Sequence, residues 1–181
     1  VSDWSMELIN THVATMVRLH NSSKKECSGI AINNLFEAKI DFRLKNDPEV
    51  LQDKIILALI KKLIDKVKKV QDNFSDLKML SFIHGDLHTG NILVDHNRVQ
   101  YVDWEEARYD DYALDLAGLL LSQPINTELY FDAYQKAAQP DSSLATRVII
   151  WLLYKDLSFL LHKKWESLSP STRTIHQSTQ E

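Results

Sequence analysis

The sequence predicts a mainly helical α+β domain with a small β-hairpin at its polar centre. Two features indicate this class. Most apolar residues recur at helical spacing, and two short strand-like segments, NILVD and RVQYVD, are separated only by His96 and Asn97. At 181 residues, of which 44% are hydrophobic, the chain has the length and composition of one globular domain with its own core.

The N-terminal part is predicted to begin with an amphipathic helix. From Ser5 to His20 apolar residues recur at intervals of three and four, and the polar segment NSSKKECSG that follows has the composition of an exit loop. Residues 29–46 are ambiguous, because LFEAKIDFRL half-alternates like a strand while no turn signal fixes its ends. We leave that segment unassigned.

A longer helix is predicted after Asp47 and Pro48, which suit its N-cap and first turn. Its apolar stripe runs from Ile56 to Val70. The opposite face could bind anions, but in an acidic chain a solvated face is the simpler interpretation. That face carries Lys54, Lys61, Lys62, Lys66, Lys68 and Lys69.

The segment MLSFIH has the pattern of a short strand that leads into a polar loop, and the hairpin follows at once. Helical spacing returns near residues 112–122, 127–138 and 143–168. The last of these is apolar nearly all round for three turns, so we expect a central core helix there. Residues 169–181 hold few apolar side chains and are expected to form a flexible tail.

Charge and composition narrow the range of partners. The net charge of −4 favours neither nucleic acid nor an anionic membrane surface. The longest apolar run, VIIWLLY, is far shorter than the ~20 residues of a membrane span, so we expect no membrane partner. A single cysteine, Cys27, excludes an intramolecular disulfide framework and fits a reducing compartment, for which the cytoplasm is the default.

The densest polar segment of the chain is FIHGDLHTGNILVD. One interpretation is a zinc or iron site, since His84, Asp86 and His88 would face one side of an extended chain. Gly85 and Gly90 weaken this interpretation, because they favour an irregular loop over a continued strand.

A second interpretation combines Asp86 with the hairpin. With a two-residue turn at 96–97, Asn91 falls opposite Val102, and Asp103 returns to the same end of the hairpin. One amide oxygen and one carboxylate suit Mg²⁺, which keeps further positions for water and phosphate. Asp86 would stand free of the ion and could accept a proton from a substrate hydroxyl.

The strings HGDLHTGNILV, YVDWEEARYDD and LDLA, in this order, closely resemble the aminoglycoside phosphotransferase and choline kinase group of small-molecule kinases, which share the protein-kinase-like fold. DLHTGN keeps the Asp-x-x-x-x-Asn spacing of the kinase catalytic loop, and DW stands in place of DFG. The resemblance implies a catalytic loop at 84–91 and a metal-binding segment at 103–105. It is carried by residues 80–118, and the flanking helices agree only in pattern.

The resemblance also implies a role for each residue of this core. Asp86 would be the catalytic base, and Asn91 and Asp103 would hold Mg²⁺ beside the phosphates of ATP. His84 would brace the backbone of the catalytic loop and the metal-binding segment. Asp115 would be a buried helix carboxylate that hydrogen-bonds amides of the catalytic loop.

Two further residues, His88 and Glu105, are candidates for substrate contact. Glu105, Glu106, Asp110 and Asp111 could form an acidic rim that attracts a cationic acceptor, such as an aminosugar or a choline-like amine, although solvated surface acids are the commoner explanation. Where relatives usually have GDP, this chain has DDY, which leaves the local turn open.

A kinase of this type grips the nucleotide with an N-terminal lobe that carries a flexible phosphate loop and a Lys held by a helix Glu. The four glycines of the chain, Gly29, Gly85, Gly90 and Gly118, cannot form a Gly-rich loop. We therefore expect residues 1–168 to be a C-terminal lobe whose N-terminal nucleotide-binding lobe is missing. By itself this lobe is expected to be inactive.

Two hypotheses of function follow. The first is an ATP- and Mg²⁺-dependent kinase that phosphorylates a hydroxyl of a small molecule, of the aminoglycoside, choline, sugar or amino-alcohol type. The second is a non-catalytic kinase-like module that binds a metabolite or a protein. The complete set of Asp86, Asn91 and Asp103 favours the first.

Overall fold

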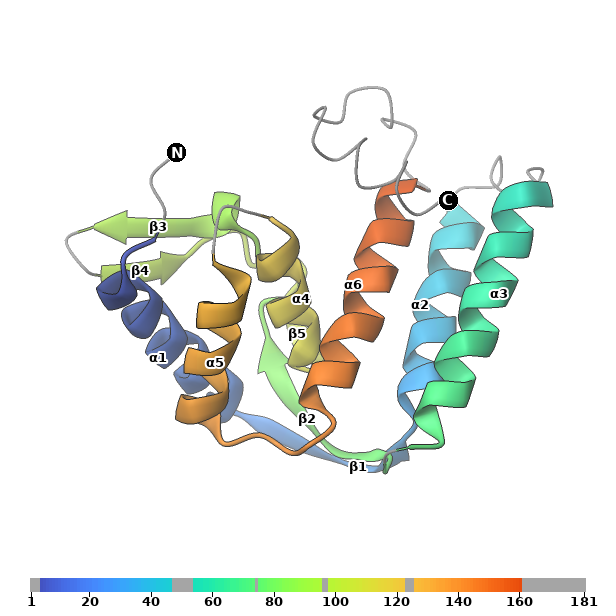
Figure 1. The fold of residues 1–181 in the computed structure, drawn as a ribbon, viewed down its shortest axis with the longest axis horizontal. Coiled ribbons are helices and arrows are strands. Elements are labelled where there is room, and N and C mark those ends of the chain that lie inside the picture. The colour runs from blue at the N-terminus through green and yellow to red at the C-terminus, as the bar shows by residue number, and fades with distance from the viewer. Residues whose placement is uncertain (1–3, 47–53, 74, 96–97, 123–125, 161–181) are drawn as a thin grey trace.

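The structure, a computed structural model, describes residues 4–46, 54–73, 75–95, 98–122 and 126–160 (Figure 1). These residues form a mainly helical fold with small antiparallel sheets, which confirms the predicted class. The helices are α1 (Met6–Ser22), α2 (Ile32–Asn46), α3 (Lys54–Gln71), the 3-10 turn η2 (Thr89–Asn91), α4 (Ala113–Leu121), α5 (Thr127–Ala138) and α6 (Leu144–Leu160). The strands are β1 (Lys24–Ile30), β2 (Leu77–Ile83), β3 (Ile92–Asp95), β4 (Arg98–Tyr101) and β5 (Arg108–Asp110).

Helix α4 lies at the centre of the fold, between α5 and α6 (Figure 1). Every residue from Ala113 to Leu119 is buried. Helix α6 packs against α4 on one side and against α2 on the other, and α3 packs on α2. Helix α1 packs against α5 and β2. The first turn of α4 is therefore surrounded by other elements, so a polar residue placed there must find its partners inside the protein.

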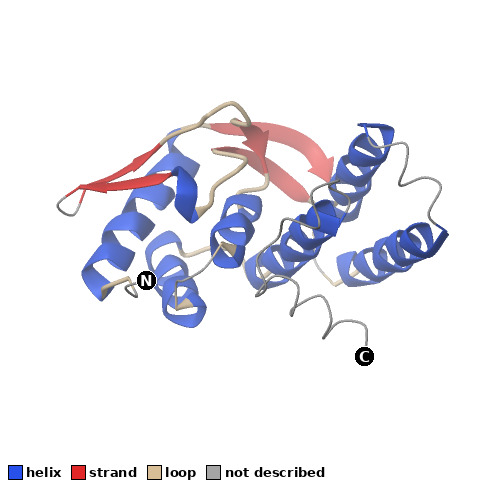
Figure 2. Cartoon of the chain, turned by 90° about the horizontal axis from the view of Figure 1, so that it is seen from above, coloured by secondary structure: helices blue, strands red, loops and turns tan. Residues whose placement is uncertain are grey.

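The strands form two antiparallel sheets, which Figure 2 shows along one edge of the molecule with most helices on the other side. The three-stranded sheet has the order β1-β2-β5, and β3 and β4 form a separate hairpin. In the hairpin Asp95 lies opposite Arg98, as a two-residue connection requires. The predicted strand before the loop and the predicted hairpin are confirmed. Strand β5 was not predicted; it pairs with the end of β2 over only three residues.

The segment NSSKKECSG is not a loop throughout, so that prediction was wrong. Helix α1 ends at Ser22, and β1 follows over Lys24–Ile30, with Lys24 opposite Ser81 of β2. Since β1 is an edge strand whose first three residues are exposed, its polar composition carries no alternating apolar pattern.

The segment left unassigned at 29–46 completes β1 and forms α2. Ile32, Phe36 and Ile40 are fully buried at intervals of four, which is the spacing of one helical face. The next predicted helix is confirmed as α3, and its six lysines are exposed as expected. Its predicted N-cap, Asp47 with Pro48, lies outside the described residues.

Helices α4 and α5 confirm the segments predicted near 112–122 and 127–138. The segment predicted at 143–168 is described as α6 up to Leu160, and the predicted tail at 169–181 lies outside the described part. Helix α6 is central, but it is not enclosed on all sides, because Ile149 is 57% exposed and Leu153 is 38% exposed. Within the described ranges we find no helix that combines the length and apolar character needed to cross a bilayer.

Candidate active site

The loop that follows β2 turns sharply at Gly85. The φ angle of this residue is +87°, in the left-handed region that favours glycine. A Cβ at this position would lie 2.2 Å from the carbonyl oxygen of Glu106, so the two polypeptide segments touch here without a side chain between them. Only glycine fits both constraints, and its position brings the candidate catalytic loop against the segment that follows Asp103.

Asp115 anchors this loop from the first turn of α4. Its carboxylate is fully buried and accepts hydrogen bonds from the backbone amides of His84, at 2.9 Å, and Gly85, at 2.8 Å. The Nε2 atom of His20 lies 3.1 Å from the same carboxylate, while Nδ1 hydrogen-bonds the hydroxyl of Tyr134 at 2.8 Å. The amide contacts are those expected of Asp115, and they bind the loop to the centre of the core.

A second close contact joins the loop to α4. A Cβ added to Gly118 would lie 2.5 Å from the carbonyl oxygen of Leu87, so the helix and the loop backbone approach each other directly. Leu87 itself is 1% exposed. The loop is therefore held by polar contacts at one end and by close backbone packing further along.

The ring of His84 contacts the segment that precedes Asp103. Its Nε2 donates to the carbonyl oxygen of Val102 at 2.8 Å, and the ring lies 4.7 Å from that of Trp104, centroid to centroid. His84 thus joins the loop to the segment before Asp103, as a bracing residue should. This orientation does not support a zinc or iron site with Asp86. Among the described residues, no group of three His, Cys, Asp or Glu side chains is placed to hold a metal ion.

The side chain of Asp86 is half exposed and carries one strong ion pair. The Nζ atom of Lys155, on α6, donates to Asp86 Oδ1 at 2.9 Å. Burial alone would raise the pKa of Asp86, but the charge and the hydrogen bond of Lys155 outweigh it, so that the pKa is lowered. A carboxylate that is ionised at neutral pH and still reaches solvent can accept a proton from a bound hydroxyl.

Asn91 and Asp103 stand at the same end of the hairpin. The amide of Val102 donates to the backbone oxygen of Asn91 at 3.1 Å, which places Asp103 immediately beyond this bond. The side-chain nitrogen of Asn91 donates to the carbonyl oxygen of Asp86 at 3.1 Å, so the side-chain oxygen of Asn91 is the atom suited to a cation. Asp103 is exposed and has a φ of 65°, an uncommon conformation for a residue other than glycine.

These donors fit a hard divalent cation. An amide oxygen and a carboxylate oxygen are ligands that Mg²⁺ accepts in proteins, with other positions filled by water or by substrate phosphates. The residues that could hold such an ion are Asn91 and Asp103. The carboxylate of Asp86 has a different partner, Lys155, while its backbone oxygen accepts from the Asn91 side chain.

The two candidates for substrate contact lie at the edge of this group. The Nδ1 atom of His88 accepts a hydrogen bond from the amide of Gly90 at 3.0 Å, and Nε2 lies 3.7 Å from Asp86 Oδ2. Glu105 is exposed next to Trp104. Each could meet an acceptor molecule, and a role for either remains a prediction.

The predicted acidic rim is wrong for two of its four members. Asp110 and Asp111 are buried, not at the surface, and both are paired with cations. Asp110 binds Lys39 at 2.5 Å, whereas Asp111 binds Arg147 of α6. Glu105 and Glu106 are exposed, so the acidic character of the rim rests on those two residues. The segment DDY also forms its turn without proline, because an Asp111 oxygen accepts from the amide of Ala113 at 3.2 Å.

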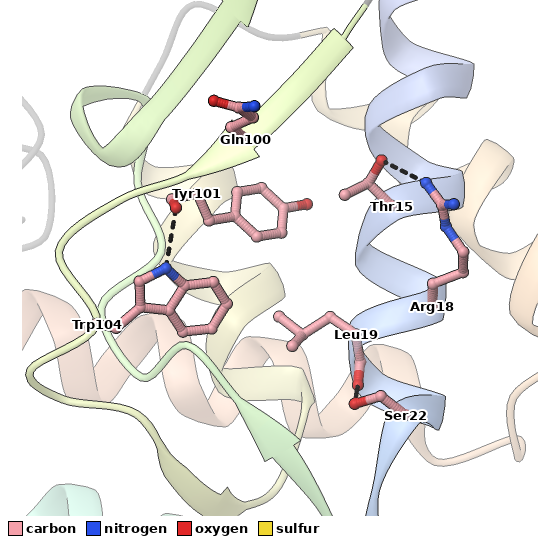
Figure 3. Close-up of a pocket in the computed structure, with 7 residues that line it drawn as sticks. All are labelled: Thr15, Arg18, Leu19, Ser22, Gln100, Tyr101 and Trp104. Carbon is pink, nitrogen blue, oxygen red and sulfur yellow. Dashed lines mark hydrogen bonds between the residues drawn. The ribbon is translucent and has the colours of Figure 1, made fainter.

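A groove lies beside the candidate site, between α1 and the end of the hairpin (Figure 3). Tyr101 and Trp104 face Leu19 across it, and the indole nitrogen of Trp104 donates to the carbonyl oxygen of Tyr101 at 2.9 Å. Trp104 also stacks on Phe82, with ring centroids 6.3 Å apart and planes inclined by 10°. The remaining lining residues are Thr15, Arg18, Ser22 and Gln100. Trp104 is therefore held in place by packing on Phe82 of β2.

Sequence reasoning missed two side chains that contact the site. Lys155 sits in the apolar segment LLYKDLSF, where a lysine must find a carboxylate or remain at the surface. His20 continues the apolar spacing of α1 after Met16 and is 3% exposed. A polar residue in an otherwise apolar position was the available signal in both cases, but it does not identify the partner.

Comparison with known proteins finds a matching family model and similar folds. A family model described as the phosphotransferase enzyme family matches residues 7–147. The fold is similar to choline kinase LicA from Streptococcus pneumoniae, with 18% identity, a TM-score of 0.63, and coverage of 94% of this chain and 61% of that chain. No match was found among curated proteins.

Two ligand-bound structures are also similar. One is amicoumacin kinase hAmiN in complex with AMP-PNP, Ca²⁺ and Ami, with 16% identity, a TM-score of 0.59, and coverage of 95% of this chain and 57% of that chain. The other is a glucosamine kinase in complex with glucosamine, ADP and inorganic phosphate, with 17% identity, a TM-score of 0.55, and coverage of 86% and 49%. At these identities the similarity shows a protein-kinase-like fold, and the chain spans about half to three fifths of the length of these proteins.

Proposed function

Because the chain belongs to the phosphotransferase enzyme family, we propose that it forms the catalytic and acceptor-binding part of an ATP- and Mg²⁺-dependent kinase that phosphorylates a hydroxyl of a small molecule. The observation that carries the proposal is the closure of the hairpin by the hydrogen bond from Val102 to Asn91. This backbone bond supports the proposal because Asn91 and Asp103 then belong to the same end of the hairpin, and the side-chain nitrogen of Asn91 donates to the carbonyl oxygen of Asp86.

In this proposal the chain supplies three groups to the reaction. Asp86 accepts the proton of the acceptor hydroxyl, for which its ionised and half-exposed carboxylate is suited. Asn91 and Asp103 hold Mg²⁺, which when bound neutralises charge on the nucleotide phosphates. His84 and Asp115 position the loop, through the contacts with Val102 and with the loop amides.

The small-molecule acceptor is supported by the similar structures, which include kinases named for choline, glucosamine and amicoumacin. Two of them were solved with adenine nucleotides or analogues, and one also contains Ca²⁺. A nucleotide and a divalent cation are accordingly proposed as ligands of this chain. The fold similarity does not choose among acceptors.

The experiment measures ADP release by the full-length protein with ATP, Mg²⁺ and a panel of hydroxylated metabolites. We expect Asp103→Ala to abolish turnover, because the carboxylate that holds the cation is removed. Asp65→Ala, an exposed carboxylate on α3, is the matched control and should leave turnover unchanged. Unchanged turnover in Asp103→Ala would reject the metal assignment. Absence of ADP release with every acceptor, together with metabolite binding, would favour the non-catalytic module.

A further inference from the structure

In the proposed function Lys155 does no more than form an ion pair with Asp86. Resting on that function, we propose that Lys155 is a catalytic residue, whose ammonium group contacts the phosphoryl group as it passes from nucleotide to acceptor. The residue comes from α6, about seventy positions after Asp86, and reaches Asp86 Oδ1 at 2.9 Å. It therefore stands beside the carboxylate that would receive the acceptor's proton.

Lys155 is mostly buried, and removing its ammonium group from water costs free energy. This argues against a chance contact at the surface. Its side chain is 15% exposed, between the buried residues Tyr154 and Leu157 of α6. Its Cε lies 3.6 Å from where a Cβ on Gly118 would be, so the aliphatic stem passes over the glycine face of α4. A lysine with so little exposure needs a compensating partner, and Asp86 is that partner.

The geometry leaves room for both proton transfer and phosphate contact. Lys155 occupies Oδ1 of Asp86, while Oδ2 faces His88 at 3.7 Å and the side chain of Asp86 is 48% exposed. An acceptor hydroxyl can thus approach Oδ2 without displacing Lys155. Within the described residues, Asp86 is the hydrogen-bond partner found for Lys155, and an ammonium group has three N–H donors. Two donors remain for oxygens of a transferring group.

The chemical step needs a cation in this place. The acceptor oxygen forms a bond to the γ-phosphorus, and its proton passes to Asp86 Oδ2. The bond from the γ-phosphorus to the bridging oxygen breaks, and ADP leaves with that electron pair. Negative charge is spread over the three equatorial oxygens of the transferring group during this exchange. A preorganised ammonium group beside the base lowers the barrier because it meets this charge where it develops.

The experiment compares Lys155→Met, Lys155→Arg and Lys39→Met in the full-length protein. Lys39 is the matched control, because it is 17% exposed, binds the buried carboxylate of Asp110, and lies outside the candidate site. We expect Lys155→Met to lower kcat by about 10²-fold or more, the loss typical of one missing transition-state donor. The KM for ATP should change less than threefold. Lys155→Arg should recover part of the loss, and Lys39→Met should keep the wild-type kcat.

Binding of ADP with fluoroaluminate, which imitates the transferring phosphoryl group, gives a second readout, and binding of ADP alone controls for a loss of folded protein. Lys155→Met should weaken this complex by a factor similar to its loss in kcat, while binding of ADP alone stays within threefold of wild type. Equal kcat and equal fluoroaluminate binding in Lys155→Met and wild type would overturn the proposal. So would a loss in Lys155→Met that Lys39→Met reproduces, since removal of any buried lysine would then explain it. If wild type releases no ADP, the proposed function fails first.

Discussion

Asp115 and Asp111 are two buried carboxylates near the start of α4, and they serve different parts of the molecule. Asp115 binds the amides of His84 and Gly85 and the ring of His20; we call these four residues the Asp115 cluster. Asp111 binds side chains of α6. Its set is the Arg147 cluster, made of Arg147, Asp111, Tyr112, Asp141, Ser143 and Trp151.

The difference lies in what each carboxylate holds. The Asp115 cluster fixes a short loop whose backbone must be placed for the proposed chemistry. The Arg147 cluster joins the start of α4 to α6, where Arg147 is 1% exposed and Trp151 donates to Asp111 at 2.7 Å. One cluster therefore positions a site and the other holds two helices together. Substitutions should separate these roles.

The largest expected effect is that of Arg147→Met. The change leaves Asp111 buried without its cation, and breaking a buried pair in this way costs about 3–5 kcal/mol. Urea unfolding followed by circular dichroism would measure the loss in the free energy of unfolding. A loss of less than about 1 kcal/mol would mean that the apolar packing of α4 on α6, and not this cluster, carries the contact.

A smaller effect is expected for Asp115→Ala, which leaves two buried amides and His20 without their acceptor. We expect a loss of about 2–4 kcal/mol in the free energy of unfolding. Hydrogen exchange of the His84 and Gly85 amides should be faster in Asp115→Ala than in Arg147→Met. The two variants are compared at urea concentrations that give them equal free energies of unfolding. If Asp115→Ala is neutral, or if those two amides stay protected, Asp115 does not anchor the loop.

His12 tests whether a buried polar residue outside both clusters behaves differently. Its Nδ1 hydrogen-bonds the hydroxyl of Tyr130 at 2.5 Å, and burial lowers its pKa from 6.5 to about 3. The unfolded chain therefore binds the proton first, so the free energy of unfolding should fall as the pH drops below 6.5.

The measurement for His12 compares wild type with His12→Phe in urea unfolding at pH 7 and pH 5. The stability of wild type relative to the variant should fall by about 2 kcal/mol between these values, because the variant lacks this proton uptake. A constant difference between the two proteins across this range would show that His12 can be protonated in the folded state.

The contrast between the clusters also explains what the sequence could predict. The amide contacts of Asp115 were expected because the strings HGDLHTGNILV and LDLA resemble the aminoglycoside phosphotransferase and choline kinase group, and that resemblance implies them. The pairing of Asp111 with Arg147 could not be predicted, because the acidic pair DD does not indicate a partner. That partner, a cation 36 positions later, pairs with Asp111 inside the protein. For the same reason Asp111 was mistaken for a surface acid.

The elements of the fold divide in the same way. Some are predictable from their own sequence, and others depend on contacts with residues far along the chain. Helices α3, α4 and α5 and the β3–β4 hairpin follow from periodicity within each segment. Strand β1 does not, because an exposed edge strand is defined by its pairing with β2, which follows much later in the chain, as in the pair of Lys24 with Ser81. Lys155 belongs with β1 in this respect, since its contact with Asp86 appears only when α6 is placed beside the loop.

The close approach of Gly118 to Leu87 makes the position of the loop adjustable by substitution. A methyl group added at residue 118 would push α4 and the loop apart, because it would clash with the carbonyl oxygen of Leu87. It would change no charge and no hydrogen-bonding group. The separation between α4 and the loop should increase with the size of the side chain introduced. A series of substitutions at residue 118 could therefore displace the loop by increasing amounts.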